Sequence, residues 1–502
     1  MNKLAELKLE TVPAWINGKP LAPAGRFGDV FNPATGQVTK HVPFCDASLV
    51  DKAVKAAAAA LPAWRDTPPL RRARVLQKFL ELLKKNQAAL AAIVTEEHGK
   101  TLPDATGSVQ RGIEVVEFAC GAPHLLKGED AENVGTQVDT YTLRQPVGVC
   151  AGITPFNFPV MVPLWMFPMA IACGNSFILK PSEKVPSASA RMAQLFQEAG
   201  LPDGVFNVVH GDKTAVDSIL NHPGIDAVSF VGSTPVAKHI YETCAKTGKR
   251  VQALGGAKNH AVVLPDADLE FAADALIGAA YGSAGERCMA ISAVVAVGAA
   301  GDRLVNLLER KARAIKVGAG RAEGVDMGPL VTSQHRDKVA GYIDAGVKEG
   351  ANLVVDGRAG AVPRQGFFLG TTLFDQVTPQ MSIYKDEIFG PVLVVLRADT
   401  LEEAIALVNR NPYANGTAIF TESGGAARRF QNEIQVGMVG INVPIPVPIA
   451  YFSFGGWKNS LFGDLHMHGV EAVKFYTRTK VITTRWPHQD TPAPGFNMPT
   501  LG

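Results

Sequence analysis

The strongest constraint on the fold is a series of short apolar runs that alternate with longer helical stretches in the first half of the chain. The runs lie at 147–153, 176–179, 206–209 and 227–231, and the helical stretches at 161–172, 188–199, 214–220 and 235–244. Strands and helices that alternate in this way form βαβ units with parallel pairing. The series predicts a doubly wound parallel sheet, and ligands bind such sheets at the carboxyl ends of the strands.

A second α/β region begins near Gly255. Its expected helices lie at 269–281, 303–316 and 336–349, and its expected strands at 292–297, 392–396 and 438–442. A chain of 502 residues exceeds what one core usually organises, so two sheet domains are expected. The predicted parts are 1–126 with 146–253 for the first domain, 254–465 for the second, 127–145 with 466–490 for a small β extension, and 491–502 for a loose tail.

Local signals mark the ends of several elements. They are an Asn-Gly pair at 17–18 for a hairpin, Asp46 and Pro69 for helix starts, and Gly99 for a helix end. Residues 101–126 are expected to form one long helix, with Arg111 on the same face as Val115 and Phe118. Alternation at 136–144 and 471–486 predicts two strands of the β extension.

Composition excludes several classes of function. The formal net charge of +2 gives no reason to expect a nucleic-acid or anionic-membrane partner. Apolar runs are interrupted by proline and polar residues, so no membrane span is expected. The six cysteines are scattered without CxxC pairs, which favours reduced thiols in a cytoplasmic protein over disulfides or zinc. His466 and His468 lack nearby acidic or thiolate ligands, so no metal site is expected.

The stretch GSAGERCMAI at 282–291 is the best candidate for reaction chemistry. Cys288 lies among small residues that would leave room for a substrate, and Arg287 directly precedes it. A thiolate is the reactive form of cysteine, and the adjacent positive charge is expected to lower the thiol pKa. The alternative interpretation is a buried, inert cysteine that packs as a small hydrophobe.

Two stretches are suited to a nucleotide. In KPSEK, Lys180 and Glu183 follow an apolar strand, and a carboxylate there can accept the ribose hydroxyls and repel a 2′-phosphate. That favours NAD over NADP. Ser233 lies at the start of a helix, whose free N–H groups suit a phosphate, although the usual GxGxxG pattern is absent. The alternatives are a solvated charged loop and an ordinary N-cap.

Two further stretches complete the candidates. In TPFNFP, Asn157 offers an amide donor for an oxyanion formed at Cys288. In DEIFGPV, Glu387 could hold a ribose while Phe389 packs against a nicotinamide. The alternatives are an Asn that caps a turn and a charged turn before a strand.

Taken together, ITPFNFP, ILKPSE, FVGST, LGG, GERC and EIFGPV resemble the aldehyde dehydrogenase superfamily, in its order and over nearly the whole chain. The resemblance implies that Cys288 is the nucleophile and Asn157 the oxyanion donor. It also implies an aldehyde dehydrogenase-like fold, with two doubly wound domains and β strands that join subunits into a tetramer built from dimers. The residues implied for NAD are Thr154, Phe156, Lys180, Glu183, Lys184, Ser233, Gly255, Glu387 and Phe389.

One departure from the superfamily points to the reaction. Ala253 stands directly before LGG, where most hydrolytic members carry the glutamate that activates water. Hydrolysis without a positioned base should lose a factor of about 10²–10⁴, whereas a thiol such as coenzyme A attacks as its own thiolate. CoA is therefore the expected acyl acceptor.

The arginines indicate the substrate. Arg111 and Arg287 suit a substrate carboxylate, which guanidinium groups bind in bidentate fashion. Together with Ala253 and the GGAKNH turn, they resemble the CoA-acylating branch that converts malonate and methylmalonate semialdehyde to acetyl-CoA and propionyl-CoA with release of CO₂. The alternatives are a hydrolytic dehydrogenase, such as one for succinate semialdehyde, and a catalytically silent binding protein on the same fold.

Overall fold

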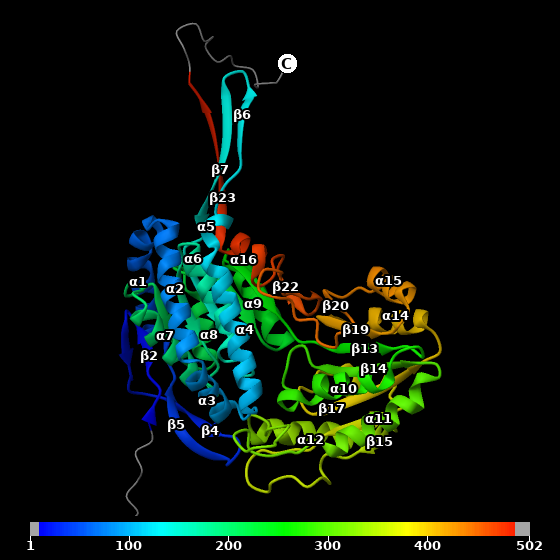
Figure 1. The fold of residues 1–502 in the computed structure, drawn as a ribbon. Helices are drawn as coiled ribbons and strands as arrows, with labels where there is room; N and C mark the ends of the chain where they lie inside the picture. The colour runs from blue at the N-terminus through cyan, green and yellow to red at the C-terminus, as the bar shows by residue number, and fades with distance from the viewer. Residues whose placement is uncertain (1–9, 487–502) are drawn as a thin grey trace, which may run out of the picture.

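The computed structural model describes residues 10–486 (Figure 1). The larger sheet within this range has eight strands in the order β22-β12-β11-β8-β9-β10-β2-β3. Its parallel strands are β8 Val149–Ile153, β9 Ser176–Lys180, β10 Phe206–Val208, β11 Ala227–Val231 and β12 Arg250–Leu254. A hairpin of β2 Ala14–Ile16 and β3 Lys19–Leu21 extends one edge, and β22 Leu461–Phe462 pairs antiparallel with β12 at the other.

Helices cover both faces of this sheet, as the alternation of its side chains requires. On β8, Val149 and Ile153 belong to one apolar cluster, whereas Cys150 belongs to the cluster on the opposite face. Every residue of β8, β9 and β11 is buried, which is why these strands are mostly apolar. The covering helices are α1 Ala47–Asp66, α2 Pro69–Lys85, α3 Gln87–His98, α4 Leu102–Cys120, α6 Met161–Ala172, α7 Ser187–Glu198, α8 Lys213–Asn221 and α9 Thr234–Lys246.

The second sheet has seven strands in the order β15-β16-β17-β14-β13-β19-β20 within the described range. They are β13 Asn259–Val263, β14 Ile291–Val297, β15 Asn352–Val355, β16 Thr372–Asp375, β17 Val392–Ala398, β19 Gly416–Phe420 and β20 Met438–Ile441, and only the β15–β16 pair is antiparallel. Its helical elements are α10 Leu269–Tyr281, the 3₁₀ turn η1 Gly282–Gly285, α11 Ala300–Ala314, α12 Ser333–Lys348, α13 Ser382–Lys385, α14 Leu401–Arg410 and α15 Gly424–Glu433. These two sheets confirm the predicted α/β fold class.

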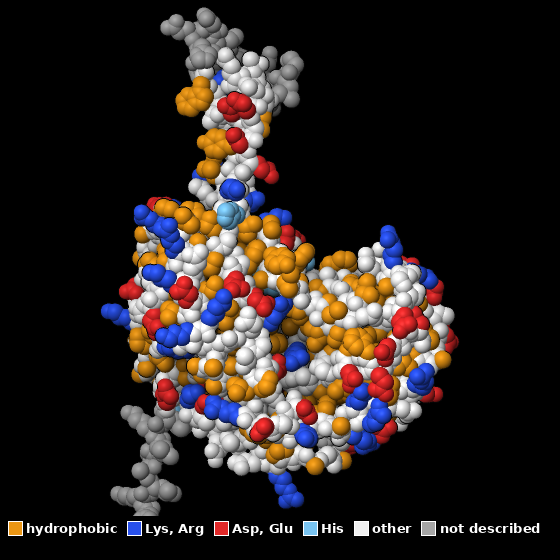
Figure 2. Space-filling model, viewed as in Figure 1, with side chains coloured by type: hydrophobic (Ala, Val, Ile, Leu, Met, Phe, Trp, Pro, Cys, Tyr) orange, Lys and Arg blue, Asp and Glu red, His pale blue; other side chains and the backbone are white. Residues whose placement is uncertain are grey.

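A narrow arm of three strands projects from the body (Figure 1). It pairs β23 Thr477–Arg485 with β7 Val138–Pro146, and β7 with β6 Asp130–Gly135. Apolar side chains lie exposed along it (Figure 2); Val481 keeps 63% of its surface and Trp486 keeps 75%. Two small sheets complete the described fold: β1 Glu10–Thr11 with β5 Gln37–Pro43 and β4 Phe27–Asn32, and β18 Tyr413–Ala414 with β21 Trp457–Lys458.

Several predicted element ends are confirmed. The Asp46 carboxylate accepts from the Leu49 N–H and caps α1, and Pro69 begins α2. Gly99 ends α3 with a φ of 95°, a conformation that glycine adopts without strain. In the hairpin, Asn17 and Gly18 both have positive φ, as a type I′ turn requires.

Two predicted elements are wrong. The expected helix over 101–126 breaks at Gly121, and the four-residue α5 Ala122–Leu125 follows α4. Pro123 explains the break, since its ring would clash with the carbonyl of Ala119 if the helix continued. The expected strand over 471–486 is helical until Tyr476, as α16 Gly469–Tyr476, and only then becomes β23.

The helical part of that segment follows from its buried residues. Ala472, Val473, Phe475 and Tyr476 are all buried, and their spacing forms one helix face. The predicted tail at 491–502 lies outside the described residues. No helix within 10–486 is both long and apolar enough to cross a membrane.

Candidate active site

Cys288 lies in the short connection between η1 and β14, at the meeting point of the two large sheets. Its carbonyl accepts from the side-chain amides of Asn259, at 2.9 Å, and Asn415, at 3.2 Å. These residues lie at the amino ends of β13 and β19, so the second sheet fixes the backbone at the thiol. Two recesses share Cys288 and Arg287 in their walls.

The small residues before Cys288 have a conformational role. Ser283, Ala284 and Gly285 all have positive φ, at 56°, 53° and 73°. A Cβ on Gly285 would lie 2.2 Å from the carbonyl oxygen of Gly390. The sequence indicated that these small residues leave space for a substrate. The turn also needs them because its backbone touches the segment that carries Glu387.

The thiol of Cys288 is not activated in the way that the sequence suggested. Burial and, to a smaller extent, the Glu387 charge raise its pKa to about 12, although the Lys100 ammonium acts in the opposite direction. Arg287 does not supply the expected effect, because its guanidinium donates to the Asp104 carboxylate at 2.8 Å. The expectation of a lowered thiol pKa is therefore wrong for the protein alone.

Asn157 is buried in the loop after β8, next to the cysteine connection. Its side-chain amide donates to the carbonyl of Glu286 at 3.0 Å, and its own backbone carbonyl accepts from Lys100 Nζ at 2.8 Å. An amide nitrogen carries two N–H groups, so one remains to meet an oxyanion at Cys288. The structure thus brings Asn157 to the segment that carries Cys288, as the sequence predicted.

The carboxyl ends of β8, β9 and β11 bring the predicted nucleotide residues to one sheet edge. Thr154 follows β8, Lys180 ends β9, and Ser233 follows β11, and these strands are neighbours in the sheet. Lys180 Nζ lies 3.3 Å from Glu183 Oε2. Ser233 precedes the 13-residue α9 and makes no capping hydrogen bond with its side chain.

These groups fit a dinucleotide. The Thr154 hydroxyl is buried and has no hydrogen-bond partner, so a polar group of a ligand could satisfy it. The first turn of α9 offers backbone N–H groups for phosphate. Lys184 Nζ lies 5.1 Å from the centre of the Phe156 ring, which in turn meets Phe389 edge-on with ring centres 5.9 Å apart.

Glu387, which precedes β17 of the second sheet, lies on the other side of the predicted nucleotide site. Its Oε1 accepts from the Ala257 N–H at 2.9 Å, and burial raises its pKa to about 7. A Cβ on Gly256 would lie 2.4 Å from Glu387 Oε2, so a side chain at this position would displace the Glu387 carboxylate. Gly255 donates its N–H to the Ser460 carbonyl at 3.0 Å, which fixes the turn from its other side.

The recess on the other side of Cys288 holds about 180 Å³ and is mostly apolar. Arg111, from α4, and Arg287 both line it. Arg111 donates to Glu114 at 2.7 Å and to the Pro448 carbonyl at 2.6 Å. A guanidinium has five N–H donors, so each arginine keeps donors for a ligand.

Ala253 is buried in β12, and its methyl side chain offers no proton acceptor. Another carboxylate, that of Glu286, lies two residues before Cys288 but packs against α3 instead. Its Oε2 lies 3.5 Å from His98 Nε2, and burial raises its pKa well above the usual value. The sequence does not single out Glu286, His98 or Lys100 as site residues. The HGK end of α3 resembled an ordinary helix stop, and no local pattern reveals its packing against the GERC segment.

Comparison with known proteins agrees with this geometry. Residues 22–482 match the model of the aldehyde dehydrogenase family. A malonate-semialdehyde dehydrogenase of Pseudomonas aeruginosa is 60% identical over 97% of this chain and 99% of its own.

Two solved structures are also similar along nearly the whole chain. The methylmalonate-semialdehyde dehydrogenase of Oceanimonas doudoroffii matches with a TM-score of 0.95 and 57% identity, over 96% of this chain and 99% of its own. A Sinorhizobium meliloti 1021 protein, solved in complex with NAD, matches with a TM-score of 0.95 and 54% identity, over 97% of this chain and all of its own. The chain therefore belongs to the aldehyde dehydrogenase family.

Proposed function

We propose that this protein is an NAD-dependent, CoA-acylating dehydrogenase of malonate semialdehyde and methylmalonate semialdehyde. The observation that carries the proposal is the position of Cys288 between two recesses. One recess contains Glu387 beside the nucleotide edge, and the other contains Arg111 and Arg287. The similar proteins named for these two semialdehydes support the substrate class.

The first half-reaction takes place at the sulfur. The Cys288 thiolate attacks the aldehyde carbon, and the carbonyl oxygen becomes an oxyanion. The free N–H of Asn157 donates to this oxyanion, and such a donor contributes about 10²–10³ in rate. Loss of hydride from the same carbon then leaves a thioester on Cys288. Arg111 and Arg287 hold the substrate carboxylate in the apolar recess and so orient the aldehyde toward the sulfur.

NAD, when bound, supplies the acceptor for that hydride. Lys180 and Glu183 would hold its adenosine ribose, Ser233 its phosphate, and Glu387 its nicotinamide ribose. The side chains that would line the rest of the cleft are Thr154, Phe156, Lys184 and Phe389, with the backbone at Gly255. The NAD-bound relative of similar fold supports this choice of cofactor.

The second half-reaction transfers the acyl group to CoA. The thiolate of CoA attacks the thioester carbon, an acyl-CoA forms, and the Cys288 thiolate is released. The β-carboxylate leaves as CO₂, since the neighbouring thioester stabilises the enolate that remains, and this enolate takes up one proton, which balances the proton that the CoA thiol lost. For malonate semialdehyde the sum is semialdehyde, CoA and NAD⁺ to acetyl-CoA, CO₂ and NADH. Ala253 supports this route because it cannot take a proton from water.

One observation favours a second candidate function, hydrolysis. The half-buried Glu387 lies in the same recess as Cys288, and its pKa of about 7 is suitable for a general base. One assay distinguishes the two functions: it measures the NADH, acyl-CoA and free acid formed from malonate semialdehyde. We expect one acyl-CoA per NADH and little turnover without CoA. Free acid at the full rate without CoA would establish the hydrolytic function instead.

We also propose a homotetramer built from dimers, in the cytoplasm. The arm of β6, β7 and β23 exposes Val481 and Trp486, side chains that a neighbouring subunit could cover. In this proposal the two domains are 1–126 with 146–253 and 254–465, and the arm belongs to 127–145 with 466–490. Sedimentation equilibrium of the full chain tests the assembly; a monomer at micromolar concentration would contradict it.

A further inference from the structure

The end of α3 enters the candidate site at a point that the proposed reaction does not use. Residues 96–100, which read EEHGK, place Glu97, His98 and Lys100 in the interior, each with almost no exposed surface. Burying three ionisable side chains within four residues carries a large free-energy penalty unless each gains a partner. Their partners lie in different elements, and those of Lys100 lie beside Cys288.

Lys100 contacts the loop that presents Asn157. Its Nζ donates to the backbone carbonyl of Asn157 at 2.8 Å and lies 4.0 Å from the centre of the Phe158 ring. The side-chain amide of Asn157 in turn donates to the carbonyl of Glu286 at 3.0 Å. Lys100, Asn157 and the GERC segment thus form one chain of hydrogen bonds that ends two residues from Cys288.

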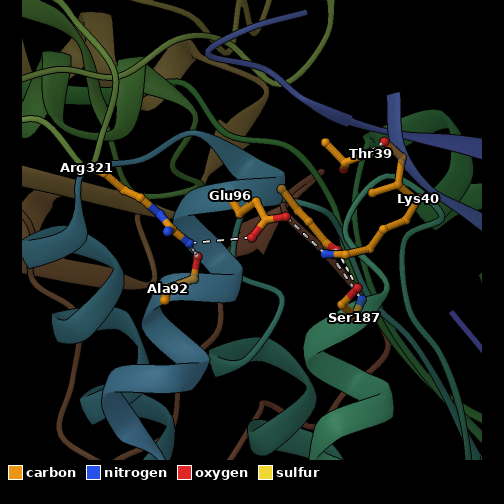
Figure 3. A network of polar contacts seen from close by, with 8 residues as sticks. Thr39, Lys40, Ala92, Glu96, Ser187 and Arg321 are labelled. Carbon is orange, nitrogen blue, oxygen red and sulfur yellow. Dashed lines mark hydrogen bonds and ion pairs between the residues drawn. The ribbon is translucent and has the colours of Figure 1, made fainter. Parts of the chain in front are cut away.

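The rest of the 96–100 segment is held from several sides (Figure 3). Glu97 accepts from Lys40 Nζ at 3.0 Å and from the Ser187 N–H at 3.1 Å. Arg321, which lies between α11 and α12 of the second sheet region, donates to the Ala92 carbonyl at 3.2 Å and lies 3.5 Å from Glu96. Because both sheet regions hold the segment, Lys100 has little freedom to move away from Asn157.

The charge on Lys100 acts on a cluster of ionisable groups. Asp104, Arg287, Glu286 and Cys288 all interact with it electrostatically, and burial lowers its pKa to about 8. At neutral pH the ammonium form is therefore retained. Among these groups the thiol is the one whose ionised form the proposed reaction needs, and a nearby cation favours that form.

We propose that Lys100 is a positioning residue for acylation of Cys288, which holds the Asn157 backbone in place and stabilises the cysteine as thiolate. This inference rests on the proposed roles of Cys288 and Asn157. The sequence favoured Arg287 for the cationic role, but the Asp104 carboxylate pairs with that charge. The simpler alternative is that Lys100 only satisfies a buried carbonyl and has no effect on the sulfur.

The experiment measures alkylation of Cys288 by iodoacetamide from pH 6 to 10, quantified on the Cys288 peptide by mass spectrometry and without aldehyde. The test variant is Lys100→Met, which keeps an unbranched apolar stem beside Phe158 and removes the charge. The matched control is Lys249→Met. Lys249 is also buried and donates to a backbone carbonyl, that of His222 at 2.7 Å, in a different part of the molecule.

We expect Lys100→Met to alkylate several-fold more slowly than the wild type at pH 7, where Lys100 carries its charge, because loss of the cation raises the thiol pKa. Its kcat should fall by a similar factor or more, while the KM for NAD stays within about twofold, because the lost interaction acts on the chemical step. Lys249→Met should match the wild type in both measurements. Overlapping alkylation profiles for Lys100→Met and the wild type would overturn the proposal.

A second variant covers the case in which Lys100→Met does not fold. Lys100→Arg keeps a donor and a charge that does not titrate, whereas Lys100 loses its proton above pH 8. The arginine variant should therefore alkylate several-fold faster than the wild type at pH 9.5, and equal rates there would overturn the proposal. Failure of the proposed function has a different signature, since Cys288→Ala would then retain aldehyde oxidation.

Discussion

The side-chain amide of Asn157 donates to the backbone carbonyl of Glu286 across 3.0 Å, and this bond joins the loop after β8 to the segment that carries Cys288. The first sheet region carries the proposed oxyanion donor, and the second carries the proposed nucleophile. Their relative position therefore depends on a contact between the two sheet regions and on neither sheet alone. The bond uses one N–H of the amide, and the other is available to the reaction.

Asn157→Ala should remove the oxyanion donor and this contact together. We expect kcat to fall by about 10²–10³, as loss of one such donor does in other enzymes. Asn157→Asp keeps the size but replaces both donors with acceptors, so it should be at least as slow. Steady-state kinetics with malonate semialdehyde, CoA and NAD check this. A kcat within threefold of the wild type in Asn157→Ala would remove Asn157 from the mechanism.

Substitution of either arginine should lower kcat/KM for carboxylated aldehydes selectively. Arg111→Leu should lower kcat/KM for malonate semialdehyde by about 10²-fold, since a charged hydrogen bond contributes about 1.5–3 kcal/mol, while kcat/KM for propanal changes little. The measurement is the ratio of the two constants in each variant. Equal losses on both aldehydes would assign Arg111 to structure, through its bonds to Glu114 and Pro448.

Arg287→Leu requires its own control because it leaves Asp104 without its cation. The double variant Arg287→Leu with Asp104→Asn removes both charges, so the remaining effect reports on the substrate. We expect the double variant to discriminate against malonate semialdehyde as strongly as the single variant does, and to unfold at a higher temperature. Recovery of normal selectivity in the double variant would contradict a role for Arg287 in binding the carboxylate.

The sequence predicted the repetitive parts of this molecule well, and the reason is local. The helices expected at 161–172 and 269–281 match α6 and α10 residue for residue, because local signals mark them: α6 is a continuous apolar run that is buried on all sides, and the Asp268 carboxylate caps the start of α10. The predicted end of the helix at residue 126 was wrong because the helical sequence pattern continues past Pro123. The surroundings of Lys100 could not be predicted, because its partner Asn157 lies 57 positions further along the chain.

NAD binding should weaken in mild acid through Glu387. Burial raises the pKa of this carboxyl to about 7, so it is ionised above that pH and gains a proton as the pH falls through it. A protonated carboxyl is a poorer acceptor for ribose hydroxyls. Between pH 8 and pH 6 the ionised fraction falls about tenfold, and the Kd for NAD should rise by a similar factor.

Fluorescence titration with NAD measures this without turnover, so the cysteine does not contribute. Glu387→Gln has no titrating group, so its Kd should be weaker than the wild-type value at pH 8 and nearly constant between pH 6 and 8. A wild-type Kd that is unchanged over that range would show that the ionised carboxylate does not contribute to NAD binding.

Gly285 should be essential for both the fold and the reaction. It has a φ of 73°, and an added Cβ would lie 2.2 Å from the Gly390 carbonyl oxygen. Gly248 has nearly the same φ, 69°, but an added Cβ there meets nothing within 4 Å. Gly248→Ala should therefore cost about 1–2 kcal/mol of unfolding free energy from backbone conformation alone. Gly285→Ala should cost more than that, and the difference measures the close approach of the two segments. Chemical denaturation gives both unfolding free energies.

The catalytic activity of the two variants, measured at a temperature where both are folded, provides a second comparison. Gly285→Ala should be nearly inactive because a shift of the turn also shifts Cys288. Gly248→Ala should keep the wild-type kcat. Equal unfolding free energies and equal activities for the two variants would mean that the turn tolerates a side chain.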